Sequence, residues 1–314
     1  MPPRVVLIAG PTASGKSALA QRVARRYGGV VINADSMQVY RDLRILTARP
    51  TPEEELEAPH RLFGHVDGAE NYSVGRWLED FGATLRELAA REQVAVVAGG
   101  TGLYFKAALR GLSDIPAVPT EVRAGVRERA RGRSSEDLHS ELARLDPLTA
   151  GRLRPSDPQR ILRALEIFEA TGQSLTRFQG ARRAALLDAA RCSAFFIEPS
   201  RSELFARIDA RFDHMIASGA LEEARALGER RLDPLLPVMR AHGAPHLLAF
   251  LAGNLPLEEA VARGKSDTRH YAKRQMTFAR HQLPEFIWLG SEGATTRVFE
   301  RLDGDFPKIR PSDQ

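Results

Sequence analysis

Hydrophobic residues in this chain gather in short, nearly continuous runs that alternate with amphipathic stretches. Runs of strand length cover residues 5–9, 30–34, 94–98, 192–197 and 286–289. Helical spacing of apolar residues covers 16–27, 73–91, 201–229 and 257–280, with an interruption at Gly219 and a short acidic helix at 53–57. Strands that alternate with helices predict an α/β fold, in which a parallel sheet is flanked by helices and joined by right-handed crossovers.

The loop after the first strand has a phosphate-binding pattern. It reads Gly10-Pro-Thr-Ala-Ser-Gly-Lys-Ser17, which fits G-x-x-x-x-G-K-[ST]. Gly15 lets the backbone curl so that N–H groups point at phosphate oxygens, Lys16 adds a positive charge, and Ser17 offers a hydroxyl to Mg²⁺. An ordinary glycine-rich turn is the alternative, but the strand before and the helix after favour phosphate binding. We call residues 10–17 the P-loop; its pattern does not identify the molecule that carries the phosphate.

The chain organisation changes between residues 114 and 191. Pro116 and Pro119 break the composition, and residues 120–190 show helical spacing without any run of strand length. Ser156-Asp-Pro158 predicts a helix start, because a capping residue precedes a proline in the first turn. We therefore predict an all-helical insertion at 114–191 within a P-loop NTPase-like core of residues 1–113 and 192–314. The polar tail from Asp303 is expected to be loose.

Two more polar residues follow predicted strands. Asp35 comes directly after residues 30–34, and Thr101 follows the 94–98 strand in a Gly-Gly-Thr-Gly segment. Ligands of open parallel sheets bind beyond the carboxyl ends of the strands, so we expect both side chains near the P-loop. Asp35 is either a helix cap or metal-associated carboxylate, or a general base that takes a proton from a nucleophile. Thr101 either caps the next helix or donates a hydrogen bond to a leaving oxygen.

Composition narrows the class of protein. With 314 residues, 43% hydrophobic and 27% charged, the chain is typical of a soluble globular protein. It has no apolar run near the ~20 residues that a membrane crossing needs, so no membrane association is expected. The single cysteine, Cys192, excludes an internal disulfide and a cysteine-based zinc site. We expect a cytoplasmic protein.

Positive charge is concentrated near the C-terminus. The whole chain has a formal net charge of +5. Residues 263–281 alone contain six Lys and Arg against one acid, Asp267, with Tyr271 and Phe278 interleaved. A solvated helix face usually mixes both signs, so this window favours contact with a nucleic-acid backbone. Arg160 and Arg163, three residues apart in the insertion, could extend the same basic surface.

Two motif absences restrict the chemistry of the P-loop. The 94–98 strand does not end in the Asp that commonly holds Mg²⁺ in P-loop NTPases. The N-K-x-D motif that reads guanine is also missing. Switch GTPases and motors are therefore disfavoured, which leaves a kinase or a transferase whose donor carries a pyrophosphate.

The motifs taken together resemble one family. The P-loop, Asp35-Ser-Met-Gln-Val-Tyr40, Gly99-Gly-Thr-Gly-Leu-Tyr104, Asp157-Pro-Gln-Arg160 with Arg163-Ala-Leu-Glu166, and Arg269-His-Tyr-Ala-Lys-Arg-Gln275 are similar, in this order, to tRNA dimethylallyltransferases of the bacterial form. The resemblance covers nearly the whole chain. It implies transfer of a dimethylallyl group from dimethylallyl diphosphate to N6 of adenosine 37 of tRNA, just 3′ of the anticodon, with release of diphosphate.

The resemblance implies a role for each matching residue. The diphosphate is expected to contact Gly10, Pro11, Thr12, Ala13, Ser14, Gly15, Lys16, Ser17 and Arg211, with Mg²⁺ held through Ser17. Asp35 is the expected general base, and Thr101 and Lys16 are expected to act at the breaking C–O bond and the leaving group. The anticodon stem-loop is expected to contact Asp35, Ser36, Met37, Gln38, Thr101, Arg123, Gln159, Arg160, Ile161, Leu162, Arg163, Lys273, Arg274, Gln275 and Arg280.

One segment departs from the family pattern. Family members commonly have a Gly-Tyr pair followed by Lys or Arg after the long helix, whereas this chain reads Arg240-Ala-His-Gly-Ala-Pro245. The tyrosine is missing, so the corresponding tRNA contact is not carried over. A monomer is expected, and the sequence does not identify which tRNAs are substrates or the order in which substrates bind.

Three other functions compete with this one. A small-molecule kinase would consume ATP and would not need the basic helix. An enzyme that prenylates free adenine nucleotides would need neither that helix nor the insertion. An RNA-binding protein switched by a nucleotide is disfavoured because the guanine motif is missing.

Overall fold

The computed structural model describes residues 3–180 and 184–305 and divides into two compact units. The larger unit is Met1–Arg110 with Leu186–Gln314, and the smaller is Gly111–Ala185. Residues 186–191, which the sequence analysis assigned to the insertion, group with the larger unit. Within the described ranges, no helix combines the length and apolarity needed to cross a membrane.

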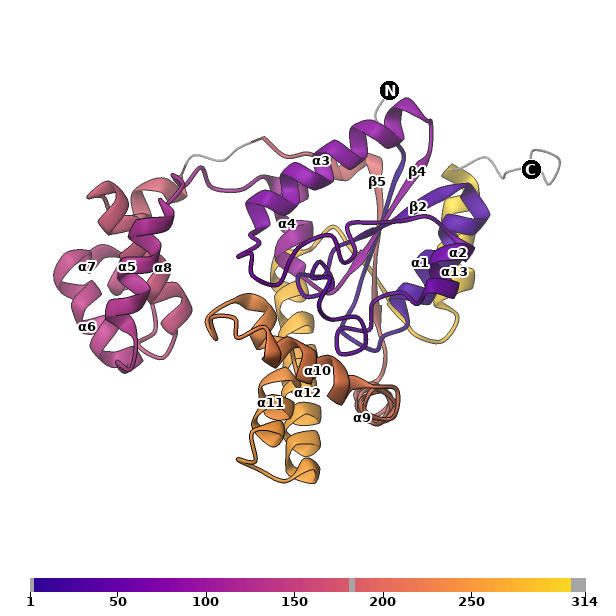
Figure 1. Cartoon of the computed structure of the whole chain (residues 1–314). Coiled ribbons are helices and arrows are strands. Elements are labelled where there is room, and N and C mark those ends of the chain that lie inside the picture. The colour runs from indigo at the N-terminus through magenta and orange to yellow at the C-terminus, as the bar shows by residue number, and fades with distance from the viewer. Residues whose placement is uncertain (1–2, 181–183, 306–314) are drawn as a thin grey trace. The chain divides into compact units, whose positions relative to one another are not determined.

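The larger unit is built on a six-stranded sheet in the order β3-β2-β4-β1-β5-β6 (Figure 1). All five strand pairings are parallel, which confirms the predicted parallel α/β sheet. The strands are β1 (Val5–Ala9), β2 (Gly29–Asn33), β3 (His60–Arg61), β4 (Val94–Gly99), β5 (Cys192–Glu198) and β6 (Ile287–Gly290). The two-residue β3 was not predicted.

Helices cover both faces of the sheet (Figure 1). Because successive side chains of a strand alternate between faces, Val6 and Ile8 pack with α1 (Lys16–Tyr27) and α13 (Ala294–Asp305). Leu7 packs on the other face, with α3 (Val74–Ala90) and α4 (Gly102–Arg110). Strands buried on both faces explain why the sequence contains continuous apolar runs rather than alternating ones.

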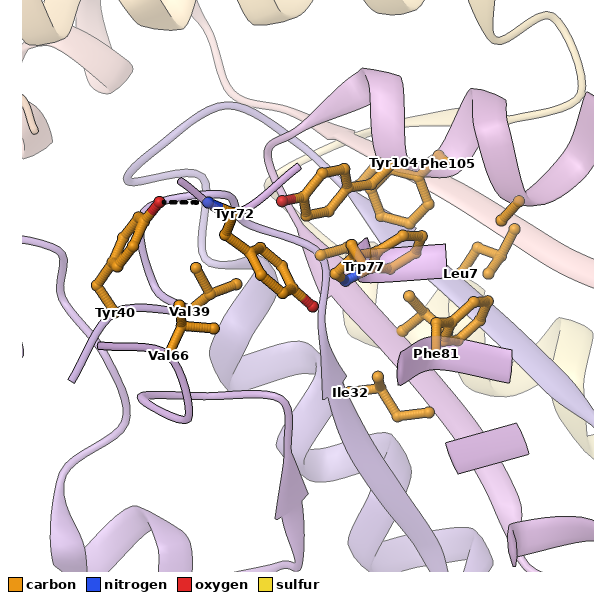
Figure 2. Close-up of a cluster of buried hydrophobic side chains, with 14 of the residues drawn as sticks. Leu7, Ile32, Val39, Tyr40, Val66, Tyr72, Trp77, Phe81, Tyr104 and Phe105 are labelled. Carbon is orange, nitrogen blue, oxygen red and sulfur yellow. Dashed lines mark hydrogen bonds between the residues drawn. The ribbon is translucent and has the colours of Figure 1, made fainter. Parts of the chain in front are cut away.

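Figure 2 shows Trp77, Phe81 and Tyr104 in one cluster of buried side chains, and this aromatic stack is bonded to the end of β2, from which Asp35 follows. The ring of Trp77 stacks on Tyr104 at 4.4 Å and on Phe81 at 4.7 Å between centroids. The Trp77 indole Nε1 donates a hydrogen bond of 2.9 Å to the carbonyl of Asn33. Two helices on one face of the sheet therefore hold the backbone just before the predicted general base.

Helix α13, the last helix of the larger unit, contradicts the prediction that a loose tail begins at Asp303. Asp303 does not begin a loose tail: its carboxylate accepts hydrogen bonds of 2.6 Å from Arg26 and from the Tyr27 hydroxyl. Residues 306–314 of that predicted tail lie outside the described residues.

Between β5 and β6 the chain forms α9 (Arg201–Ala217), α10 (Ala220–Glu229), the 3₁₀ turn Pro237–Arg240, α11 (Ala244–Leu251) and α12 (Leu257–Gln282).

The smaller unit contains helices and no strand among its described residues. Its helices are α5 (Thr120–Ala130), α6 (Ser135–Leu145), α7 (Pro147–Ala150) and α8 (Pro158–Thr171), with a 3₁₀ turn at Leu175–Gln179. Val126, Leu142 and Ile161 lie in its own hydrophobic core. The predicted start of α8 is confirmed, because the Asp157 carboxylate accepts from the Arg160 N–H at 3.2 Å and Pro158 follows it. The remaining elements are the short α2 (Pro52–Glu57) and a 3₁₀ turn at Ala189–Arg191, both in the larger unit.

Candidate active site

The P-loop leaves the carboxyl end of β1 in a conformation that suits an anion. Ala13 and Gly15 have φ values of 63° and 88°, in the left-handed region that turns the chain into α1. No side chain caps the N-terminus of α1. The buried Ser14 hydroxyl has no hydrogen-bond partner. Backbone and hydroxyl donors at this loop are therefore left for a ligand.

Two cations from distant parts of the chain meet at the P-loop. The Lys16 amine donates to the carbonyl of Pro11 at 3.2 Å, and Arg211 of α9 donates to the Thr12 hydroxyl. Burial lowers the pKa of Lys16 to about 8; the Asp35 carboxylate raises it and Arg211 lowers it further. Burial also lowers the pKa of Arg211, against an opposing effect of Asp35.

Among the described residues, no carboxylate lies within ion-pair distance of Lys16 or Arg211. Burial disfavours the charge of both cations, and Asp35 offsets that effect only in part, so an anion bound between them is favoured. This pair of unpaired cations, beside loop donors, is the strongest sign of a diphosphate-sized anion site.

Asp35 is held in a defined orientation by the residue at the end of β2. The fully buried Asn33 accepts from the Asp35 N–H at 2.7 Å and donates to the Asp35 carbonyl at 2.9 Å. Asp35 Oδ1 in turn accepts from the Met37 N–H at 2.9 Å. No described residue donates to Oδ2, which leaves that oxygen for a substrate proton.

Thr101 joins the loops that follow β2 and β4. Its hydroxyl accepts from the Ser36 N–H at 2.9 Å and donates to the Ser36 hydroxyl at 3.3 Å. These are not the contacts of a helix cap, so the capping alternative for Thr101 is disfavoured. Thr101 and Asp35 lie in one connected group of loops, as the sequence analysis expected.

Gln275, which was predicted to contact tRNA, is buried and bonded to other parts of the protein. Its side-chain oxygen accepts from the Thr12 N–H and its amide nitrogen donates to the Gly100 carbonyl, each at 2.9 Å. Gln275 is buried, and a Cβ on Gly100 would lie only 2.0 Å from its Nε2. The side chain thus ties the P-loop to the Gly99–Thr101 loop. Gln38 is similarly engaged, with its amide donating to the carbonyls of Thr47 and Ala48.

A small cavity of about 50 Å³ lies against these groups. Asp35, Thr12 and Arg211 line it on the polar side, and its apolar lining is Met37, Leu46, Ile208, Phe212 and Met215. His242 and Tyr271 also line it, with their rings 4.3 Å apart between centroids. Burial first, then Arg274, lowers the pKa of His242. His242 belongs to the atypical segment 240–245, and the sequence analysis did not propose it as a site residue.

Most of the basic residues of α12 have acidic partners. Arg269 pairs with Asp209 at 2.5 Å, Lys265 with Asp213 at 2.6 Å, and Arg280 with Glu198. Arg263 pairs within its own helix, with Glu259. Only Lys273 and Arg274 are exposed without an ion pair to any described residue. Of the six cations read from residues 263–281, three are thus paired by α9 and β5 and one within α12 itself.

The remaining predicted tRNA contacts belong to the smaller unit. Gln159 and Arg160 are exposed at the start of α8, and Leu162 is half-buried. Ile161 is completely buried in the unit's core, so its side chain is not available to a ligand. Arg123 of α5 and Arg163 of α8 both lie beside the buried Glu166.

The residues at the P-loop would fit a magnesium ion whose coordination shell comes mainly from phosphate oxygens and water. No described group of three or more His, Cys, Asp or Glu could hold a metal. Mg²⁺ commonly takes one or two protein oxygens and completes its shell with phosphate oxygens and water. The exposed Ser17 hydroxyl and the unpartnered Ser14 hydroxyl are the oxygens available beside the loop.

The fold defines a class of protein: a P-loop NTPase-like parallel sheet with the loop of residues 10–17 and Asp35 at the carboxyl ends of its strands. A family model described as IPP transferase matches residues 38–282, and one described as isopentenyl transferase matches residues 3–68. The chain belongs to the tRNA dimethylallyltransferase family, as its curated relatives establish. It is a prenyltransferase that modifies tRNA.

Those relatives are similar over almost their full length. The tRNA dimethylallyltransferase of Methylocella silvestris is 61% identical over 90% of this chain and 93% of its own. That of Beijerinckia indica is 60% identical, over 95% and 98%. Among solved structures, the tRNA isopentenylpyrophosphate transferase of Bacillus halodurans is 31% identical with a TM-score of 0.68, covering 96% of each chain. A eukaryotic dimethylallyltransferase acting on tRNA is 26% identical with a TM-score of 0.78, over 98% of this chain and 81% of its own.

Proposed function

We propose that this enzyme transfers a dimethylallyl group from dimethylallyl diphosphate to N6 of adenosine 37, the base just 3′ of the tRNA anticodon. The observation that carries the proposal is the pair of partly enclosed cations beside the P-loop, Lys16 and Arg211, with no carboxylate of a described residue at ion-pair distance. They lie next to Asp35, whose Oδ2 has no described donor. The site therefore offers cations for an anionic leaving group and, next to them, a carboxylate that can accept a proton.

The donor diphosphate is held by the P-loop. The backbone N–H groups of Ala13 and Gly15, the Ser14 hydroxyl, Lys16 and Arg211 surround the oxygens that gain negative charge when the allylic C–O bond breaks. Donors that are already in place stabilise such a developing charge without reorganising. Mg²⁺, when bound through Ser17 and the diphosphate, adds further charge neutralisation to the leaving group.

The acceptor adenine is activated by Asp35. The N6 nitrogen forms the new C–N bond while the allylic C–O bond breaks, and the N6 proton passes to the free Oδ2 of Asp35. An adenine amine is a weak nucleophile, so proton removal and accurate placement are both needed. The Thr101 hydroxyl accepts from the Ser36 N–H at 2.9 Å, and its O–H turns from the Ser36 hydroxyl to the leaving oxygen when the donor is bound.

The target base must leave the anticodon loop to reach Asp35, as for other enzymes that act on a base. We expect the anticodon stem-loop to contact Lys273 and Arg274, which have no ion pair to a described residue, together with Arg280, Arg123 and the exposed start of α8. The protein is expected to work as a monomer in the cytoplasm.

The test is a transfer assay with isotope-labelled donor. The protein is incubated with Mg²⁺, radiolabelled dimethylallyl diphosphate, and tRNA transcripts that carry either adenosine or guanosine at position 37. Label is expected only in the adenosine-containing tRNA, with one diphosphate released per label. Phosphate transfer from ATP without labelled tRNA would replace the proposal with a small-molecule kinase. Labelling of free AMP in place of tRNA would indicate an adenylate prenyltransferase.

A further inference from the structure

We propose that Glu223 of α10 is a positioning residue that limits the length of the prenyl chain the enzyme accepts. It holds the backbone of residues 44–46, and Leu46 of that segment forms part of the wall of the cavity beside Asp35. Glu223 was not among the predicted site residues. The inference deepens the proposed function and rests on it, because it takes this cavity as the place of the dimethylallyl group.

The Glu223 carboxylate accepts hydrogen bonds from three consecutive backbone N–H groups in the segment between β2 and α2. Glu223 Oε1 accepts from the N–H groups of Arg44 and Ile45 at 2.5 Å and 2.9 Å, and Oε2 accepts from that of Leu46 at 2.8 Å. Hydrogen bonds to an ionised acceptor are roughly twice as strong as neutral ones. One side chain of α10 therefore fixes a segment that lies 177–179 residues earlier in the chain.

The residues that follow are held by a second side chain. The Gln38 amide donates to the carbonyls of Thr47 and Ala48 at 2.8 Å and 2.9 Å. Glu223 thus binds the N–H groups of the first half of the segment, and Gln38 binds the carbonyls of the second half. With both kinds of backbone group engaged, the segment has little freedom, so these contacts define where Leu46 lies.

Leu46 faces α9 across the cavity. It is 7% exposed, and it lines the cavity together with Phe212 and Met215 of α9. Its Cδ2 also lies close to the backbone of the atypical segment 240–245, since a Cβ added to Gly243 would be 3.7 Å from it. The space available in the cavity therefore depends on the position of Leu46.

The surroundings of the cavity indicate that a prenyl group occupies it. The reacting carbon must lie between the diphosphate, which Arg211 binds, and the base Asp35, and both of these residues line the cavity. Its apolar lining and its volume of about 50 Å³ suit a short branched hydrocarbon. A longer chain needs the wall to move, and Glu223 opposes that movement at Leu46.

Glu223→Gln is the first test. It keeps the size of the side chain but replaces one acceptor oxygen by an NH₂ group, so the segment should loosen. The ratio of kcat/KM for geranyl diphosphate to that for dimethylallyl diphosphate should rise about tenfold, the equivalent of one hydrogen bond to a charged group. Hydrogen exchange of residues 44–46, followed by mass spectrometry, should become faster. Glu222→Gln, a change at the neighbouring exposed acid, should alter neither quantity.

Leu46→Ala tests whether Glu223 acts through Leu46. Shortening the wall itself should raise the same ratio by about tenfold or more, the usual value of a few methylene groups in an apolar pocket. In the double variant the ratio should equal that of Leu46→Ala alone, because the positioned side chain is gone. An unchanged ratio in Glu223→Gln despite faster exchange, or a rise that adds fully to that of Leu46→Ala, would overturn the proposal.

A binding measurement separates this inference from the proposed reaction. The probes are dimethylallyl and geranyl thiolodiphosphates, in which sulfur replaces the oxygen of the bond that breaks, and they are titrated into the full chain with Mg²⁺ and tRNA. If the native enzyme transfers no prenyl group but Glu223→Gln shifts the relative affinity toward the geranyl compound, only the proposed reaction fails. If transfer proceeds and neither the kcat/KM ratio nor the relative affinity shifts, only the role of Glu223 fails.

Discussion

The cations at the P-loop and the cations along α12 differ in what surrounds them. Lys16 and Arg211 are partly enclosed and have no carboxylate at ion-pair distance among the described residues, and burial lowers the pKa of each. Along α12, Arg269 and Lys265 are each matched by an Asp of α9. A cation enclosed without a partner is destabilising unless a ligand supplies the anion, whereas a paired surface cation contributes little beyond local structure.

Pairing therefore distinguishes a binding residue from a structural one better than the number of charges does. Six cations against one acid in residues 263–281 indicate a strongly basic helix. The folded protein leaves Lys273 and Arg274 as the cations of that window without an ion pair to a described residue. The comparison can be tested by replacing the acidic residues of the two regions as well as the basic ones. Replacement of the acidic residues has the largest expected effect on the rate.

Asp35→Asn and Asp209→Asn remove one charge each from the two regions. Asp35→Asn keeps an oxygen for the Met37 N–H but cannot take the N6 proton, so kcat should fall by about 10²–10⁴-fold while tRNA affinity changes little. Asp209→Asn loses only the partner of Arg269, so kcat should remain near that of the native enzyme. Single-turnover prenyl transfer with saturating tRNA measures both. A native rate for Asp35→Asn would remove Asp35 from the role of base.

How much of this site the sequence could predict depends on how local each signal is. The P-loop, Asp35 and Thr101 follow strands that are recognisable as apolar runs, and their convergence follows from parallel topology. The role of Asn33 was not predicted, because the residue lies inside such an apolar run. A polar residue at the end of a buried strand must nevertheless find hydrogen-bond partners, so its presence is a signal that could have been used.

Partners that are distant in the sequence could not be predicted in the same way. Asp209 and Glu198 neutralise α12 from 60 and 82 residues away. Gln275 hydrogen-bonds Thr12 across 263 residues, and no local pattern distinguishes that role from an RNA contact. Helix α13 was missed for a related reason, since its Val298 and Leu302 stripe is short and the polar residues around it resemble a tail.

The pH dependence of donor use tests the unpaired cations. With the pKa of Lys16 near 8, the lysine is charged below that pH and neutral above it, so its attraction for diphosphate is lost as pH rises through about 8. Because kcat/KM reports the free enzyme, kcat/KM for dimethylallyl diphosphate should decline above pH 8.

Lys16→Arg provides the control for this pH profile. Arginine keeps its charge at high pH, so the alkaline decline should disappear even if the absolute rate is lower. Lys16→Met should lower kcat/KM by about 10²–10³-fold at all pH values, the typical cost of one missing donor to a developing anion. A decline that persists in Lys16→Arg would assign the titration to another group.

The smallest expected effect is the difference between Lys273→Ala and Arg269→Ala, two variants on the same helix, in tRNA binding and in stability. Lys273→Ala removes an exposed cation without an ion pair, so the salt slope of tRNA binding should fall by about 0.9 while the free energy of unfolding stays the same. Arg269→Ala breaks the pair with Asp209, in which both side chains are partly exposed at 30% and 40%, so unfolding should become easier by less than about 1 kcal/mol with the slope unchanged. Both quantities are obtained from salt titrations of binding and from urea unfolding. If the two variants lower the slope equally, then tRNA displaces Asp209 from Arg269, and pairing in the free protein no longer separates structural cations from binding ones.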